Sequence, residues 1–254
     1  MTPRHDQAWE DWGSIDPLFA ILTEPKYQHG GGDRSEFLSS GEGLVAGILG
    51  HCNDLGLPQE RDRALDFGCG VGRLTAPLAQ HFGEVVGLDV SESMVAQARS
   101  LHDVANCHFE VHRGNDLHLY PDASFDLVLC VLVLQHLASQ DAMLRYLAEF
   151  ARVLRPGGAL AVQLPSKVPP PQAPPGWRTR TGIRHRTANL LRRSGVNASY
   201  LYRHLGWTPA MTMTAVSDEL TRSTLAEHGA PVVFATPPDK DAGGTESQIY
   251  FATR

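Results

Sequence analysis

The sequence predicts an α/β protein built on a doubly wound, mostly parallel sheet. Apolar runs of strand length alternate with segments of helical periodicity between Arg63 and Leu164. A glycine-rich turn directly follows the first of these runs, at Gly68, Gly70 and Gly72. At 254 residues, the chain is long enough for one such domain with additions. We expect the additions to be an N-terminal lid, an insert after the fifth strand and an antiparallel C-terminal strand.

Residues 1–59 are expected to form the N-terminal lid and a first helix. The first 35 residues mix aromatic and polar side chains without a regular period, and three glycines at 30–32 suit a hinge. Tyr27 and His29, beside this hinge, are candidates to close over a ligand, although both also suit a solvated loop. A helix follows, with apolar residues on one face at Leu44, Ile48, Cys52 and Leu55.

Residues 60–165 carry the predicted parallel core. Its strands are expected at 63–67, 84–89, 107–111, 125–130 and 159–164. Helices are expected between them at about 71–82, after the N-cap Ser91 and from Ser139 to Leu154. Pro77 is tolerable near the beginning of the first of these helices. Residues 156–158, Pro-Gly-Gly, predict a turn into the fifth strand, and the alternation implies helices on both faces of the sheet.

Residues 166–215 are expected to form a Pro/Arg-rich insert that caps the core after the fifth strand. Six prolines between positions 165 and 175 predict a stiff connector, because proline continues neither a helix nor a central strand. A helix is expected around 187–193. Tyr200, Tyr202 and His204 follow it, and these residues either line a ligand pocket or pack the insert.

Residues 216–254 are expected to complete the core. A helix is predicted at about 216–228, followed by strands at 232–235 and 248–252. Residues 241–244 form a turn signal between the two strands, which predicts an antiparallel hairpin.

The charge is unevenly distributed along an acidic chain. The net charge is −6, but residues 166–204 hold eight Lys or Arg and no Asp or Glu. This segment favours an anionic acceptor and a solvated helix face equally, and both interpretations stay open. The acidic balance argues against a nucleic-acid partner. The sequence gives no indication of oligomeric state.

No stretch approaches the ~18 apolar residues of a membrane span, and the first residues lack a signal-peptide core. We therefore expect a cytoplasmic protein without a membrane partner. The four cysteines are too far apart for a zinc site, so we expect small buried thiols and no metal.

The glycine turn and the acids around it predict a nucleoside cofactor. Asp89, at the end of the second strand, is placed to bind a ribose diol. Arg73 stands where a dinucleotide fingerprint needs a small residue, and Asp66 would repel a pyrophosphate but attract an ammonium group. A Tyr-x-x-x-Lys pair is missing, which further disfavours an NAD-dependent oxidoreductase. A Walker-type loop is excluded because no Gly-Lys-Ser/Thr follows the glycines.

Over about residues 60–165, the chain resembles the class I S-adenosylmethionine-dependent methyltransferases of the small-molecule type. The motifs that carry the resemblance are Leu65–Thr75, Asp89, Asn115-Asp116, Phe125–Leu137 and Arg152–Gly158. It implies a Rossmann-like fold that binds S-adenosylmethionine, with Asp66 near the ammonium group, Asp89 on the ribose hydroxyls and Asp116 on the adenine amine. The cofactor-binding residues that it implies are Asp66, Gly68, Cys69, Gly70, Arg73, Asp89, Val90, Met94, Asn115, Asp116, Leu117, Val131 and Gln135.

Methyl transfer from a sulfonium is an in-line displacement, so orientation carries much of the rate. His136, in the segment after the fourth strand, is the candidate base or acceptor-positioning residue; the alternative is a histidine that only contacts backbone at a helix start. The expected function is methyl transfer to oxygen or nitrogen of a small metabolite, with the insert at residues 166–215 as the acceptor-side cap. The alternative is a non-catalytic S-adenosylmethionine-binding protein that regulates or scaffolds a partner. The fourth strand is not followed by Asn/Asp-Pro-Pro-aromatic, which disfavours a nucleic-acid base as acceptor.

Overall fold

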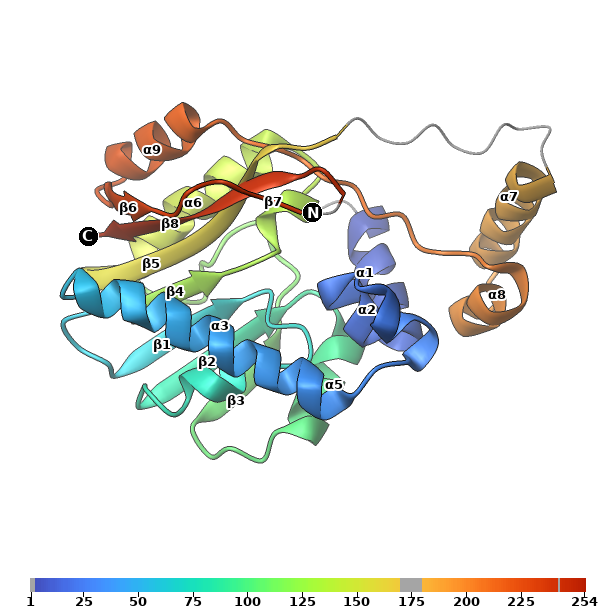
Figure 1. Cartoon of the computed structure of the whole chain (residues 1–254), viewed down its shortest axis with the longest axis horizontal. Coiled ribbons are helices and arrows are strands. Elements are labelled where there is room, and N and C mark those ends of the chain that lie inside the picture. Colours follow the sequence, from blue (N-terminus) through green and yellow to red (C-terminus); the bar gives the residue numbers. More distant parts are fainter. Residues whose placement is uncertain (1–2, 170–179, 242) are drawn as a thin grey trace.

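The computed structural model describes residues 3–169, 180–241 and 243–254, and these residues form an eight-stranded sheet (Figure 1). The strand order is β3-β2-β1-β4-β5-β8-β6, and β7 pairs with β8. The strands are β1 (Arg63–Phe67), β2 (Glu84–Asp89), β3 (Cys107–Val111), β4 (Phe125–Cys130), β5 (Leu154–Lys167), β6 (Val232–Ala235), β7 (Asp239–Lys240) and β8 (Glu246–Thr253). Strands β1 to β5 are parallel, and β8 runs antiparallel to β5, β6 and β7. The predicted fold class is confirmed.

Helices cover both faces of this sheet and extend beyond its carboxyl edge. They are α1 (Pro3–Ile15), α2 (Pro17–Leu22), the 3-10 turn η1 (Pro25–Gly30), α3 (Arg34–Asp54), α4 (Thr75–Leu78), α5 (Glu92–Leu101), η2 (Leu134–His136), α6 (Gln140–Val153), α7 (Arg180–Arg193), α8 (Ala198–Leu205) and α9 (Asp218–Glu227). Figure 1 shows α6 and α9 on the side of the sheet opposite α3.

The side-chain alternation of the strands builds a separate apolar core on each face. In β1, Leu65 packs with the α6 residues Tyr146 and Phe150, whereas its neighbour Ala64 packs with Ile48 of α3. This period of two is the pattern expected of a sheet that is buried on both faces. The sheet is therefore a rigid base for the loops at its carboxyl edge.

The predicted helix at 71–82 is wrong in extent, because α4 covers only Thr75–Leu78. Gly72 has φ +84° and still belongs to the glycine turn, so the helix begins after it. At the other end, the side-chain amide of Asn106 donates to the carbonyl oxygens of Ala79 and Phe82, both at 2.9 Å. These two bonds hold the chain in a turn instead of a further helical turn.

The turn predicted at residues 156–158 is also wrong, because β5 already begins at Leu154. Phe125 of β4 pairs with Leu154, and Leu127 pairs with Ala159, so residues 155–158 bulge out between these two pairs. The left-handed Gly157, with φ +76°, permits the bulge.

The C-terminal strands and the cysteines follow the sequence expectations in most respects. The antiparallel C-terminal strands are confirmed, with β7 added before the turn at 241–244. Phe82, Phe109 and Phe150 are buried in the core, and all four cysteines are free thiols, with Cys107 only half-buried. Most of the predicted proline-rich connector, and Arg178, lie outside the described residues. Among the described helices, none combines the length and apolarity that a bilayer span requires.

Candidate active site

A cavity opens at the carboxyl ends of β1, β2 and β4. Its empty space is about 890 Å³, including the solvent at its mouth. The glycine turn, the beginning of α5, the loop after β4 and the N-terminal segment all contribute to its wall. The predicted site residues that line it are Asp66, Gly68, Cys69, Gly70, Arg73, Asp89, Val90, Met94, Val131 and His136. Residues from β1, the glycine turn, β2, the beginning of α5 and the loop after β4, which are far apart in sequence, are thus brought together.

The glycine turn is closely covered by the other walls of the cavity. Gly68 has φ +80°, and a Cβ atom on it would lie 2.2 Å from a methyl carbon of Val133. Gly70 has φ +54°, and its Cβ would lie 2.7 Å from the terminal carbon of Ile21. The left-handed backbone favours glycine at both positions, and at Gly68 the approach of Val133 excludes a side chain as well. The turn therefore presents bare backbone toward the cavity.

Asp66 is a carboxylate held almost entirely out of water. Its side chain is 2% exposed, and it accepts a hydrogen bond from the Thr75 hydroxyl at 2.6 Å. Burial raises the pKa of Asp66 to about 6, although the Thr75 hydroxyl and the charge of Arg73 oppose this rise. A cation bound in the cavity would therefore stabilise the ionised form of Asp66.

Asp89 joins the glycine turn to the beginning of α5. One of its oxygens accepts from the Gly70 amide at 2.8 Å, and the other accepts from the Ser91 amide at 2.9 Å. Desolvation raises the pKa of Asp89 above its usual range in spite of these bonds. A carboxylate has about four acceptor positions and the backbone amides do not fill them all, so the structural role of Asp89 is compatible with binding a hydroxyl group.

Arg73 and His112 bring unsatisfied nitrogen atoms to the cavity wall. Arg73 is 5% exposed and donates from Nη1 to the Ser40 hydroxyl at 3.3 Å, while its buried Nε has no hydrogen-bond partner. His112 is 7% exposed, and its buried Nε2 is also without a partner. Burial lowers the pKa of both side chains. Such orphaned polar atoms are uncommon in native proteins and fit a polar ligand.

Four predicted cofactor residues are not among the residues that line the cavity. Asp116 is exposed and pairs with the ring of His118, which lowers the pKa of Asp116. Leu117 is completely buried, and its amide donates to a Glu149 oxygen at 2.7 Å. The other two are Asn115 and Gln135. The sequence order after β3 identified this loop, but His112, which was not predicted, is the residue from it that reaches the wall.

The loop after β4 orients His136 toward the cavity. The Nδ1 atom of His136 lies 3.1 Å from the carbonyl oxygen of Thr212, so Nδ1 carries the proton and donates it. Nε2 is then the acceptor nitrogen, and it lies 3.3 Å from the amide nitrogen of Gln135. Leu132, in the same loop, has φ +63°, a strained value for a non-glycine residue and one that clusters at functional sites.

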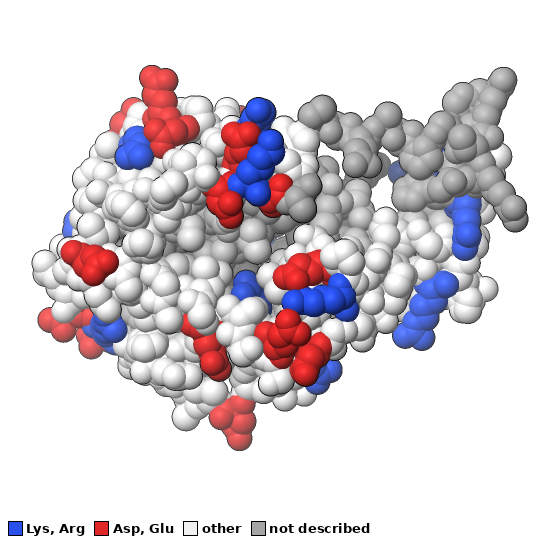
Figure 2. All heavy atoms as spheres, in the orientation of Figure 1, with Lys and Arg blue, Asp and Glu red and all other residues white. Residues whose placement is uncertain are grey.

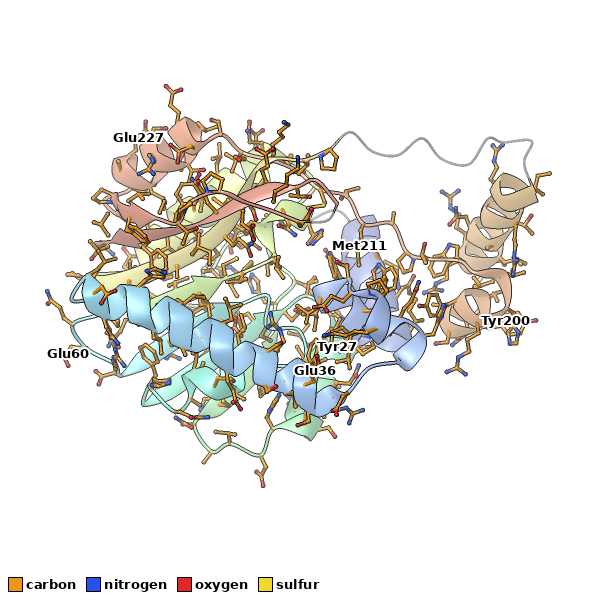
Figure 3. All side chains as sticks on the ribbon, viewed as in Figure 1. Tyr27, Glu36, Glu60, Tyr200, Met211 and Glu227 are labelled. Carbon is orange, nitrogen blue, oxygen red and sulfur yellow. The ribbon has the colours of Figure 1, made fainter. Side chains whose placement is uncertain are left out.

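The N-terminal segment reaches the cavity with residues that the sequence did not single out, namely Trp9, Ala20 and Ile21. The expected lid residues lie elsewhere. Tyr27 is 1% exposed and packs edge-on against Phe37, so its interpretation as a solvated residue is wrong (Figure 3). His29 donates from its backbone amide to Asp16 at 2.6 Å. Long-range tertiary contacts fix the positions of these N-terminal residues, and no local sequence motif predicts such contacts.

Comparison with known proteins identifies the family. A family model described as a methyltransferase domain matches residues 65–162. A demethylmenaquinone methyltransferase from Lactobacillus johnsonii is 31% identical over 188 residues, which cover 72% of this chain and 73% of that protein. The chain belongs to the class I S-adenosylmethionine-dependent methyltransferases. The cofactor of this methyltransferase is S-adenosylmethionine (SAM), as the sequence predicted.

Other relatives match this methyltransferase over shorter stretches or share only its fold. A trans-aconitate 2-methyltransferase from Deinococcus radiodurans is 42% identical over 106 residues, covering 41% of this chain and 38% of that protein. The chain spans about two fifths of the length of several such curated relatives. The crystal structure of a magnesium protoporphyrin IX methyltransferase from Synechocystis with bound SAH has the same fold, with a TM-score of 0.58, 20% identity and coverage of 98% and 99% of the two chains.

Proposed function

We propose that this methyltransferase transfers the methyl group of SAM to an oxygen or nitrogen of a small metabolite. The observation that carries the proposal is a single cavity that combines the buried Asp66, the unsatisfied Arg73 and the oriented imidazole of His136. The relatives named above are methyltransferases of demethylmenaquinone and trans-aconitate, which are small molecules. This supports a small acceptor here.

The residues of the cavity fit the charges of SAM. Asp66 would hold the ammonium group, because a nearby cation favours its ionised form. Arg73 would hold the carboxylate of the methionine part through its unsatisfied Nε. Asp89 would bind the ribose hydroxyls, with Val90 and Met94 beside the adenine. The bound cofactor supplies an electrophilic methyl group on a sulfonium.

His136 is the proposed base for a hydroxyl acceptor. Its Nδ1 proton is engaged by the Thr212 carbonyl, which fixes the tautomer and makes Nε2 the basic nitrogen. The side-chain amide of Gln135, 3.3 Å from Nε2, would give way to the acceptor hydroxyl. As the acceptor oxygen bonds to the methyl carbon, the hydroxyl proton moves to Nε2. An amine acceptor needs only to arrive unprotonated, and His136 would then position it.

An uncharged acceptor is better supported than an anionic one. Leu132, Val133 and Leu137 surround the loop position of His136 and offer no charge. Two of the insert arginines are engaged elsewhere: Arg184 donates to the His204 carbonyl oxygen, and Arg192 pairs with Asp11. On the face shown in Figure 2, the described part of the α7–α8 lobe shows blue side chains and no red ones. No described residue of α7 or α8 lines the cavity, so an anion attracted to these basic side chains would bind outside it.

We also propose that residues 1–59 act as a lid and residues 166–215 as an acceptor-side cap. The two segments share contacts: Tyr202 donates its hydroxyl to the buried Asp16 at 2.7 Å, and Met211 packs into the same apolar cluster as Trp12 (Figure 3). Tyr200, in contrast, is 56% exposed on the outer side of α8, away from this shared cluster (Figure 3). The cytoplasmic location stays a prediction.

Transfer from methyl-labelled SAM to mixtures of small hydroxylated and amino metabolites tests the proposal. Mass spectrometry should detect a product heavier by one labelled methyl group. His136→Gln should lower the rate for a hydroxyl acceptor at least about a hundredfold, the usual contribution of a general base, and leave SAM binding intact. SAM binding without transfer to any metabolite would favour the non-catalytic alternative.

A further inference from the structure

We propose that Trp9 of α1 forms one wall of an acceptor site for a flat, uncharged aromatic alcohol and determines its specificity. This inference rests on the proposed function, since it names the acceptor class of the same cavity. None of the sequence motifs pointed to Trp9, because it lies in a segment without regular periodicity.

Trp9 and the proposed base face each other at the cavity wall. Their ring centroids are 4.9 Å apart with an interplanar angle of 66°, an edge-to-face arrangement. Both side chains are half-buried and both line the cavity. An acceptor that delivers a proton to His136 must therefore lie beside the indole of Trp9.

The position of Trp9 is fixed by its two following residues. Glu10 accepts from the Ser91 hydroxyl at 3.0 Å and from the Ser93 amide at 3.1 Å, at the beginning of α5. Asp11 accepts two bonds from the Arg192 guanidinium, at 2.6 and 3.1 Å. These bonds attach α1 to both the cofactor-side helix and the insert. The indole is thereby held in place before an acceptor arrives, which lowers the cost of ordering a specificity site.

The surroundings select the chemistry of the acceptor. An indole favours contact with another aromatic ring in offset-stacked or edge-to-face geometry. The remaining neighbours, Leu132, Val133 and Leu137, are aliphatic, so a buried carboxylate or phosphate would lose hydration without compensation. Among the described lining residues Arg73 is the only Lys or Arg, and it lies over Phe37 and near Asp66. A phenolic hydroxyl, with a pKa of about 10, is also acidic enough to give its proton to an imidazole more readily than an aliphatic alcohol.

Binding of three matched probes, measured by calorimetry at saturating S-adenosylhomocysteine (SAH), tests the acceptor class. The probes are 2-naphthol, its saturated analogue decahydro-2-naphthol and the anionic 6-hydroxy-2-naphthoate. We expect 2-naphthol to bind at least about tenfold more tightly than either of the others. Failure of 2-naphthol to bind, or equal binding of the anionic probe, would overturn the assignment.

Variants of Trp9 then distinguish two roles of this residue, contact with the acceptor and support of the fold alone. Trp9→Ala should weaken 2-naphthol binding at least about tenfold, Trp9→Phe should retain it within about threefold, and both should bind SAH within about threefold of the wild type. Leu38→Ala, at a half-buried residue of the same apolar cluster that does not line the cavity, is the control and should leave both affinities unchanged. If Trp9→Ala loses SAH and 2-naphthol equally, Trp9 only holds the fold. If the wild type fails to bind SAH at all, the proposed function itself fails.

Discussion

At the residue scale, Asp66 has the most informative environment in the molecule. It is a buried carboxyl group whose pKa is raised to about 6, against about 3.9 in an unfolded chain. Over the interval between these values, the folded protein holds the proton more tightly than the unfolded chain does. The contribution of Asp66 to the free energy of unfolding is therefore fully present below about pH 4 and is lost as the pH rises through about 6.

Asp66→Asn should remove this pH dependence, because an amide accepts the Thr75 bond but does not titrate. The free energy of unfolding of the wild type, relative to that of Asp66→Asn, should fall by about 3 kcal/mol between pH 3 and pH 7, with about two thirds of the fall between pH 4 and pH 6. Urea titrations at several pH values measure this difference. Asp62→Asn, at an exposed carboxylate, is the control and should follow the wild-type profile. A difference that stays constant with pH would contradict the assignment.

Gly68 should be less replaceable than a glycine with the same backbone conformation in open space. Gly56 also has a left-handed φ, +69°, but a Cβ atom there would meet nothing within 4 Å. Gly56→Ala should cost about 1–2 kcal/mol of unfolding free energy from the backbone alone. Gly68→Ala should cost a further ~1–3 kcal/mol, because its Cβ collides with Val133. Equal losses in the two variants, measured by urea denaturation, would show that Val133 does not press on the turn.

Individual residues differ in how far the sequence could predict them. The cavity is lined by Asp66, Gly68, Gly70 and Asp89, because a strand followed by a tight turn fixes their position in the fold. Their contact with the cofactor stays a prediction. Asp116 was expected there as well, but its carboxylate pairs with His118 at the surface. The direction of a loop side chain depends on neighbours that a local motif does not contain.

At the element scale, all five parallel strands were predicted within the core, four of them with the observed bounds, because apolar alternation is a strong local signal. The predicted length of α4 was wrong because of two long-range hydrogen bonds, which the side-chain amide of Asn106 donates to carbonyl groups after the helix. The packing of α1 against α7 was also invisible in the sequence. It depends on Asp11 and Arg192, which are 181 positions apart.

The bond between Asp11 and Arg192 should hold α7 against the N-terminal segment. Arg192→Gln leaves a carboxylate that is only 7% exposed without its cation, which costs roughly 1.5–3 kcal/mol. Amide hydrogen exchange over residues 188–193 should accelerate at least about tenfold, while exchange in β1 and β4 stays unchanged. Arg193→Gln, at the exposed neighbouring position, serves as the control. Equal acceleration of exchange in both variants would show that the ion pair between Asp11 and Arg192 does not hold α7 in place.

At the scale of the whole molecule, the carboxyl edge of the sheet is covered by segments from both sides of the core in sequence. The N-terminal segment and the insert meet over this edge through Asp11, Asp16, Arg192 and Tyr202. The central 98-residue match to the methyltransferase domain, residues 65–162, contains the acids and glycines of the cofactor side. Trp9, Ile21 and the insert lie outside it, so the cofactor was predictable from sequence motifs and the acceptor was not.

The most direct test of the account is the affinity of the purified protein for SAM, SAH and NAD, measured by calorimetry on the wild type and on Asp89→Ala. SAM and SAH should bind to the wild type, and NAD should not. Asp89→Ala should weaken SAM binding at least about tenfold, or about 1.4 kcal/mol. Binding of NAD alone, or an unchanged dissociation constant for SAM in Asp89→Ala, would contradict the account.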